Sequence, residues 1–471
     1  MLVLSFSLSL GLFLIVGLAS QFKVQKKTSD YLLAGQSVSP SLVGISAVAS
    51  WCSGFMFIGQ IGYTYSKGLS SIWIMIGLIA GDIFVSRITH RKIRSQSEVK
   101  KHESYVEALL DFDSYDSYKF ANISRVVVSL VAIVALIGYS SAQIMSSGVA
   151  LESILDINYT LGAVLTTILI ALYCFSGGIR ASIWTDALQA LVMIIAMMIL
   201  YMTSVSETGG FSQWISSLAS VSKNYLSLYP SEIQEGQIWF LALIIMGWFA
   251  GGMGVAGQPH VMVRFMTLKD VKLINRARLY YYVYYILLYS LAIGIGLSAR
   301  VLLPSLPVEK YEMALPILSR LILPDALVGV ILAGLFASTM STADSLIISS
   351  SATLTRDLFP KLKGSYAGAK IATLSFSGFA LLLAVFSKAT VFQLVIIFGG
   401  LLSACFAPVL ILKSLKVQLK PKAIIIMIVS SAISTTLWRE LGLSYLIYEV
   451  AIGMGMGLLM GFILKDHSQK S

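Results

Sequence analysis

Long apolar runs separated by short polar stretches dominate the chain. A helix needs roughly 20 mostly apolar residues to cross a bilayer, and about thirteen runs reach that length. They lie at about 1–21, 40–66, 69–90, 122–152, 157–176, 181–203, 236–258, 279–302, 324–355, 369–387, 390–412, 423–438 and 444–464. The pattern predicts an all-α polytopic membrane protein with about 13 transmembrane helices.

Small and polar residues interrupt two of these runs near the middle. The second run carries Ser-Ala-Val-Ala-Ser-Trp-Cys-Ser-Gly at 46–54, and the seventh carries four glycines and a proline within 250–260. Backbone groups that are freed at a helix break inside a bilayer have to face protein, ions or water. Two such breaks, about five spans apart, are typical of inverted-repeat transporters that bind their solute near the bilayer midplane. The alternative is a pair of kinked, closely packed helices.

The ninth run gathers hydroxyl groups on one helical face. Four hydroxyls follow the spacing i, i+3, i+4 and i+7, with an acid at the edge of the face: Ser338, Ser341, Thr342, Ser345 and Asp344. A carboxylate inside a membrane is costly and by default indicates a functional site. Hydroxyls, freed carbonyls and a carboxylate are the oxygen ligands that hard cations prefer. The face predicts a sodium site; for the hydroxyls alone, helix–helix contact remains the alternative.

A second acid, Asp186, stands just inside the sixth run. Its residue type and position suit either a cap on a helix N-terminus or an ion ligand, and the residues alone leave both open. We expect no membrane-embedded arginine that could hold a substrate carboxylate. Free backbone amides at the helix breaks are therefore the predicted carboxylate site.

The composition excludes a soluble protein. Hydrophobic residues make up 57% of the chain and charged residues 12%, whereas about a quarter of an average soluble domain is charged. The net charge of +11 does not indicate nucleic acid, because the basic residues lie in short loops between apolar runs. With the N-terminus outside, about four-fifths of them fall on the cytoplasmic side, as the positive-inside rule requires.

These features predict a multi-pass protein of a cell membrane, most simply a bacterial inner membrane, with a cytoplasmic C-terminus. The sequence contains no P-loop motif for nucleotide binding and no catalytic cluster, so we do not expect an enzyme. The expected partners are the lipid bilayer, sodium and a small-molecule substrate. We expect the protein to work as a monomer.

Four stretches resemble the sodium/solute symporter family, and most of all its sodium/proline symporter branch. They are 46–54, 173–180 with Trp184-Thr185-Asp186, 257–260 with Arg264-Phe265-Met266, and 340–345 with 349–351. The resemblance implies a leucine-transporter-type core of two inverted five-helix repeats. The implied parts of this single domain, 1–471, are an extra helix at 1–21, repeats at 40–203 and 236–413, and two extra helices within 423–464.

The resemblance also implies where ions and solute bind. The first sodium site corresponds to the carbonyls of Ala49, Cys52 and Ser338 with the hydroxyls of Ser341 and Thr342. A second sodium site, which some members have, corresponds to Asp186, Ser341, Asp344 and Ser345. The substrate-lining positions correspond to Trp51, Ser53, Tyr139, Gly251 and Val255. We therefore expect one sodium ion, with oxygens in place for a second.

Three substrate positions depart from the proline branch. Trp51 replaces an acidic residue, while Gly251 and Val255 replace a tryptophan and a tyrosine. Met56 stands where the sugar branch has a glutamine, which argues against a sugar. We expect sodium-coupled import of proline or another small amino acid by alternating access. The alternatives are a symporter for a sugar or an organic monocarboxylate, a membrane sensor domain without transport, and a passive channel.

Overall fold

The computed structural model describes residues 1–110, 118–230 and 238–465, and it is almost entirely helical. The α-helices are α1 (Leu2–Ala19), α2 (Thr28–Leu33), α3 (Pro40–Trp51), α4 (Ile61–Lys67), α5 (Ile72–Lys100), α6 (Tyr105–Leu109), α7 (Tyr118–Leu155), α8 (Tyr159–Glu207), α9 (Phe211–Val221), α10 (Ile238–Met253), α11 (Pro259–Met266), α12 (Ile274–Leu302), α13 (Ala314–Ile322), α14 (Asp325–Ala352), α15 (Tyr366–Phe386), α16 (Val391–Leu394), α17 (Gly400–Ser414), α18 (Pro421–Glu440) and α19 (Glu449–Ile463).

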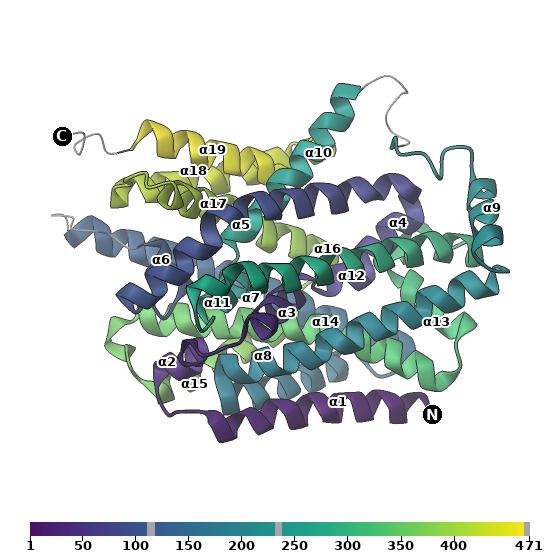
Figure 1. Cartoon of the computed structure of the whole chain (residues 1–471), viewed down its shortest axis with the longest axis horizontal. Coiled ribbons are helices and arrows are strands. Elements are labelled where there is room, and N and C mark those ends of the chain that lie inside the picture. The colour runs from purple at the N-terminus through teal and green to yellow at the C-terminus, as the bar shows by residue number, and fades with distance from the viewer. Residues whose placement is uncertain (111–117, 231–237, 466–471) are drawn as a thin grey trace.

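The long helices run side by side across the molecule, and the start of α1 and the end of α19 lie at opposite ends of this bundle (Figure 1). Within the described residues, 10 helical segments are long and apolar enough to cross a membrane. One of them, Tyr159–Glu207, covers two predicted spans, and the shorter apolar helices α3 and α19 are counted separately. The multi-pass helical class is confirmed, while the number of thirteen crossings stays a prediction.

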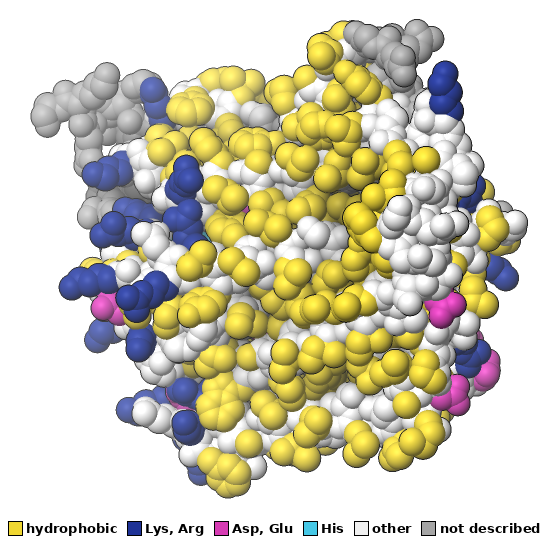
Figure 2. Space-filling view, turned by 45° about the vertical axis from the view of Figure 1, so that its right-hand side comes forward, with side chains coloured by type: hydrophobic (Ala, Val, Ile, Leu, Met, Phe, Trp, Pro, Cys, Tyr) yellow, Lys and Arg dark blue, Asp and Glu magenta, His cyan; other side chains and the backbone are white. Residues whose placement is uncertain are grey.

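Apolar side chains cover the middle of the bundle surface, and lysine and arginine gather at one end (Figure 2). This basic end is the one at which α19 ends in Figure 1. Large apolar side chains such as Leu8, Ile15 and Leu172 are at least half exposed. An exposed apolar surface of this extent suits contact with lipid chains and would be a liability in water.

The predicted second span is broken as the sequence indicates. Helix α3 starts at Pro40, with Ser39 as its N-cap, and it ends at Trp51 because Cys52 leaves helical geometry at φ −77° and ψ 67°. A short π-helix, Met56–Gln60, then leads into α4. The predicted seventh span breaks in the same way, since α10 passes through a 3-10 turn at Gly254–Gly257 before α11 begins at Pro259.

Helix α8 is folded back on itself at Gly178, which joins the predicted fifth and sixth spans. Gly178 has φ 57° and ψ −141°, a backbone conformation that is open mainly to glycine. A Cβ at this position would lie 2.3 Å from the carbonyl oxygen of Tyr31. The tight turn therefore depends on the missing side chain.

Helix α14 lies at the centre of the bundle and packs against α3, α7, α8 and α11. Its residues from Ile331 to Ala352 are all buried. A helix so fully enclosed by protein can carry hydroxyls and a carboxylate without exposing them to lipid. The site described below is built around it.

Candidate ion and solute sites

The break in α3 frees two backbone carbonyls, and hydroxyls of α14 bond to both. In an unbroken helix the carbonyl of Ala49 would accept from residue 53, but the amide of Ser53 donates to Trp51 instead, at 2.9 Å. Ser341 Oγ donates to the Ala49 carbonyl at 3.1 Å, and Thr342 Oγ1 donates to the Ser50 carbonyl at 3.0 Å. Segments almost 300 residues apart thus meet through oxygen atoms inside the bundle.

Two further residues predicted for this cluster lie nearby but differ in their contacts. The carbonyl of Ser338 accepts from Ser341 Oγ at 3.2 Å and from Thr342 Oγ1 at 3.1 Å. It therefore belongs to the oxygen cluster. Cys52 is buried and lines the solute pocket. Its carbonyl takes no part in these bonds, and the second carbonyl from α3 is that of Ser50.

Asp186 and Asp344 form the centre of a second polar cluster. Ser46 Oγ donates to Asp186 Oδ2 at 2.6 Å. Asp344 accepts from Tyr173 at 2.9 Å and from Ser182 at 2.8 Å. Asp186 lies within the second arm of α8, well past the turn at Gly178, and its recorded partners are side chains. The interpretation of Asp186 as a helix cap was therefore wrong.

An arginine that sequence reasoning missed lies in this second cluster. Arg264 on α11 is fully buried, and its Nη2 lies 3.3 Å from Asp186 Oδ2 and 3.7 Å from Asp344 Oδ1. The expectation that no membrane-embedded arginine could hold a substrate carboxylate did not foresee this arginine, which pairs with carboxylates of the protein itself. Two buried carboxylates are stable only with a nearby positive charge. Once both acids were placed inside the membrane, this requirement could have predicted a buried basic partner.

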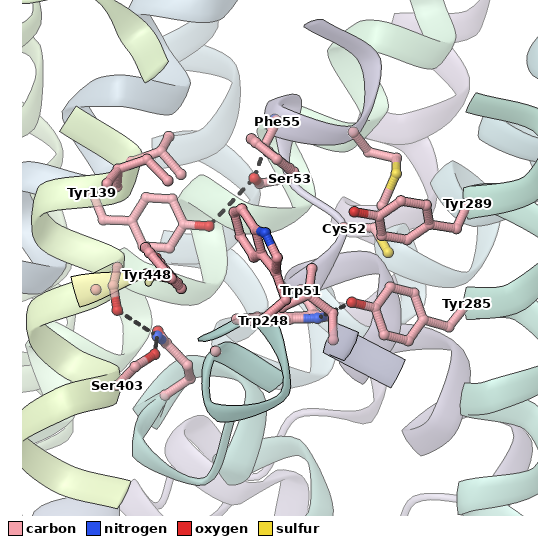
Figure 3. A pocket seen from close by; sticks show the side chains of 18 residues that line it. Trp51, Cys52, Ser53, Phe55, Tyr139, Trp248, Tyr285, Tyr289, Ser403 and Tyr448 are labelled. Carbon is pink, nitrogen blue, oxygen red and sulfur yellow. Dashed lines mark hydrogen bonds between the residues drawn. The ribbon is translucent and has the colours of Figure 1, made fainter. Parts of the chain in front are cut away.

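A pocket opens beside the break in α3, with a cavity of about 80 Å³ (Figure 3). Seven of the 18 residues that line it are aromatic: Trp51, Phe55, Tyr139, Trp248, Tyr285, Tyr289 and Tyr448. Among the described residues no charged side chain lines it. Trp248 stacks on Tyr448 with ring centroids 4.7 Å apart, and Tyr139 donates to Ser53 Oγ at 3.3 Å.

The substrate positions predicted from the sequence fall mainly in this pocket. Trp51, Ser53, Tyr139 and Gly251 line it. Val255 does not line it and is buried in the 3-10 turn that follows α10. The aromatic residues of α12 and the start of α19 were missed, because no local pattern links them to the two broken helices.

Gln258 supplies the most polar part of the pocket wall. Its Nε2 donates to the Gly399 carbonyl and to Ser403 Oγ, both at 2.8 Å. Its Oε1 is buried and has no hydrogen-bond partner in the part of the chain that the structure describes. A buried acceptor without a partner is costly, so this oxygen is suited to receive a donor from a bound solute.

The backbone amides at the α3 break are already used. Ser53 N donates to the Trp51 carbonyl, Gly54 N to Gln143 Oε1 at 3.1 Å, and Phe55 N to Ser53 Oγ at 3.3 Å. The predicted capture of a substrate carboxylate by free amides therefore does not fit this break. Among the wall hydroxyls, Ser53 accepts from Tyr139 and from Phe55 N and keeps its own proton, so it is the donor that remains.

Comparisons with known proteins agree with this architecture. The high-affinity proline transporter PutP of Bacillus subtilis (strain 168) is 28% identical over 458 residues, which cover 95% of this chain and 94% of the relative. A sodium/proline symporter of Staphylococcus aureus (strain JH9) is 27% identical over 353 residues, which cover 74% of this chain and 67% of the relative.

Solved structures share the fold. A Na⁺-coupled sialic acid symporter in a substrate-bound outward-open state matches with a TM-score of 0.81 at 20% identity, covering 98% of this chain and 97% of its own. Mhp1, a nucleobase-cation-symport-1 family transporter, matches with a TM-score of 0.58 at 14% identity and 92% coverage of both chains. The fold is therefore of the leucine-transporter type, as expected.

A family model described as the sodium:solute symporter family matches residues 31–418. That stretch is well over half of the 471 residues and includes both broken helices, the α14 hydroxyl face and the lining of the aromatic pocket apart from Tyr448. The protein belongs to the sodium:solute symporter family.

Proposed function

We propose that this symporter imports a small zwitterionic amino acid, with proline as the first candidate, together with sodium. The observation that carries the proposal is the meeting of the broken helix α3 with the hydroxyl face of α14. The proline-transporting relatives support the choice of proline, and the pocket supports a small solute.

The first sodium site is proposed at the oxygen cluster between these helices. Ala49, Ser50 and Ser338 contribute carbonyls, and Ser341 and Thr342 contribute hydroxyls that now donate to those carbonyls. All five groups are neutral oxygens, which suits a hard monovalent cation. An ion here would pull α3 and α14 together and fix the Trp51 end of the solute pocket.

The solute is proposed to bind in the aromatic pocket beside the break. A cavity of about 80 Å³ has room for several water molecules, and therefore for a solute of few heavy atoms. The Gln258 Oε1 would accept from the solute ammonium, and the faces of Trp248 and Tyr448 would add a cation–π attraction. Ser53, whose oxygen accepts from Tyr139, would donate to the carboxylate.

By resemblance, Gly251 stands where the proline branch has a tryptophan. We propose that Trp248 supplies the indole of the pocket wall in its place. Gly251 and Trp248 lie three residues apart on α10 and both line the pocket. A Cβ at Gly251 would lie 3.0 Å from the Tyr448 ring. The proposed reason for the glycine is that it leaves this space to Tyr448, which stacks on the indole supplied one turn earlier.

The orientation is proposed from the charge distribution. The basic end of the bundle, at which α19 ends (Figure 2), is placed in the cytoplasm by the positive-inside rule, with the N-terminus outside. One sodium ion that crosses about 100 mV gains roughly 2.3 kcal/mol, and a tenfold gradient adds about 1.4 kcal/mol. Together these support a several-hundred-fold accumulation of a neutral solute.

Uptake by purified protein in proteoliposomes tests the proposal. Labelled proline should enter with saturable kinetics in external sodium and should not enter in choline. Competition with unlabelled amino acids, sugars and organic acids identifies the solute class. If only sugars or only monocarboxylates compete, that class replaces amino acids as the proposed substrate. Sodium conductance without saturable uptake would indicate a channel. If the protein shows neither conductance nor uptake, the sensor alternative is favoured.

A further inference from the structure

We propose that the guanidinium of Arg264 is the built-in cation of the second ion site, so that this protein binds a single sodium ion. The inference rests on the proposed function, because it takes the first sodium site as given. Arg264 has no exposed surface, and its Nη2 lies within 3.7 Å of carboxylate oxygens on both Asp186 and Asp344. The positive charge therefore sits between the two acids.

Three of the four groups predicted to hold a second sodium contact this guanidinium, namely Asp186, Asp344 and Ser345. Nη2 donates to Ser345 Oγ at 2.5 Å, in addition to its contacts with the two carboxylates. The fourth predicted ligand, Ser341, donates to the Ala49 carbonyl in the first cluster. Each of the four groups thus already has a polar partner within the protein, although one oxygen, Asp186 Oδ1, has none among the described residues.

Other hydroxyls fix the arginine in place. Its Nε donates to Ser46 Oγ at 3.2 Å, and Nη2 also donates to Ser182 Oγ. Ser46 in turn donates to Asp186, and Ser182 donates to Asp344. This alternation of donors and acceptors leaves the guanidinium held by hydroxyls and acids from three helices, α3, α8 and α14.

A sodium ion in the same cluster would lie a few ångströms from this positive charge. Both charges would be fully buried, so water and salt would hardly screen their repulsion. Sodium and Arg264 are therefore alternatives at this site. The arginine belongs to α11, the inner half of a broken helix, and its charge does not come from solution. It adds no gradient energy to transport, in contrast to a second bound ion.

Equilibrium binding of radiolabelled sodium to the purified full-length protein tests the inference without a solute. The wild type should bind one sodium per chain. Arg264→Gln removes the charge and keeps hydrogen-bonding groups, so it should bind two. Arg264→Lys keeps a cation on α11 and should stay at one. Two sodium ions on the wild type, or one on a folded Arg264→Gln, would overturn the inference.

The failures are distinguishable from one another. A wild type that binds no sodium would reject the proposed function, whereas a wild type that binds two would reject only the role of Arg264. If Arg264→Gln does not fold, Arg264→Gln combined with Asp186→Asn and Asp344→Asn is the second variant, because it removes all three buried charges. It should bind one sodium, at the first site, and a second bound ion would contradict the dependence on these acids.

Discussion

The indole Nε1 of Trp51 donates a hydrogen bond to the hydroxyl of Tyr285 at 2.9 Å. This bond joins the last residue of α3 to α12 across one side of the solute pocket (Figure 3). It orients the indole at the point where the helix breaks. Trp51 is thus a fixed part of the pocket wall.

Trp51→Phe should weaken solute binding while leaving sodium binding almost unchanged. A hydrogen bond of this kind is worth about 1 kcal/mol, which corresponds to a roughly fivefold higher KM for proline. Tyr285→Phe should give a similar loss, and the double variant should be no worse than either single one. Fully additive effects would show that the two groups act separately. Initial rates in proteoliposomes provide the measurement.

Ser341→Ala and Thr342→Ala should each raise the sodium concentration needed for half-maximal uptake. Loss of one buried polar partner costs about 1–3 kcal/mol, so a shift of about tenfold is expected. Thr339→Val is the matched control, because Thr339 is buried on the same helix and its hydroxyl pairs with Ser147. An unchanged sodium dependence in both alanine variants would reject the proposed site.

Gln258→Leu should raise the KM for proline by about tenfold or more, since it removes the acceptor proposed for the ammonium group. Ser403→Ala removes only a partner of Nε2 and should have a smaller effect. Cyclopentanecarboxylate, which has no ammonium group, serves as a competitor. It should compete weakly with proline in the wild type, and Gln258→Leu should not weaken it further. If Gln258→Leu lowered the affinity for proline and for cyclopentanecarboxylate equally, the proposed contact between Gln258 and the ammonium group would be contradicted.

Tyr105→Phe should shift the protein toward an inward-open form. Tyr105 on α6 donates to the Ala256 carbonyl at 2.6 Å, beside the α10–α11 break, and burial raises the pKa of its hydroxyl well above the ordinary value. The donor is therefore protonated at any physiological pH. Loss of about 1 kcal/mol should change the population ratio roughly fivefold. Accessibility of an engineered cytoplasmic-side cysteine measures it, with Tyr445→Phe as the exposed control.

Gly178→Ala should reduce the amount of folded protein in the membrane. The new Cβ would meet the Tyr31 carbonyl at 2.3 Å, in a backbone conformation that alanine avoids. Gly378→Ala is the matched control, because a Cβ there has nothing within 4 Å. Yield and melting temperature in detergent provide the readout. Equal behaviour of the two variants would show that the turn tolerates a side chain.

The sequence predicted the breaks in α3 and between α10 and α11 because glycine, proline and serine are unusual in the middle of an apolar run. The hydroxyl spacing on α14 predicted a polar face for the same reason. The structure bonds that face to the carbonyls of Ala49 and Ser50. Its role as a sodium site stays a prediction.

Two features could not be predicted from local patterns. Arg264 resembles any basic residue near the end of a membrane helix, and only the folded chain brings Asp186 and Asp344 to it. Tyr285 and Tyr448 are ordinary aromatic residues in apolar surroundings, and they become pocket walls through contacts across hundreds of residues. Long-range packing decides both the partners of Arg264 and the pocket role of these tyrosines. The spacing of residues along one helix carries no information on such packing.

The central position of α14 also bears on biosynthesis. Apart from its neighbour Ser345, the side chains that bond to or pair with Asp344 lie on α8 and α11 and precede it in the chain. Because translation proceeds from the N-terminus, the membrane already contains these partners when α14 emerges from the ribosome. Its acid can thus be sheltered as the helix leaves the insertion machinery, and truncations that remove α11 should leave α14 poorly retained in the bilayer.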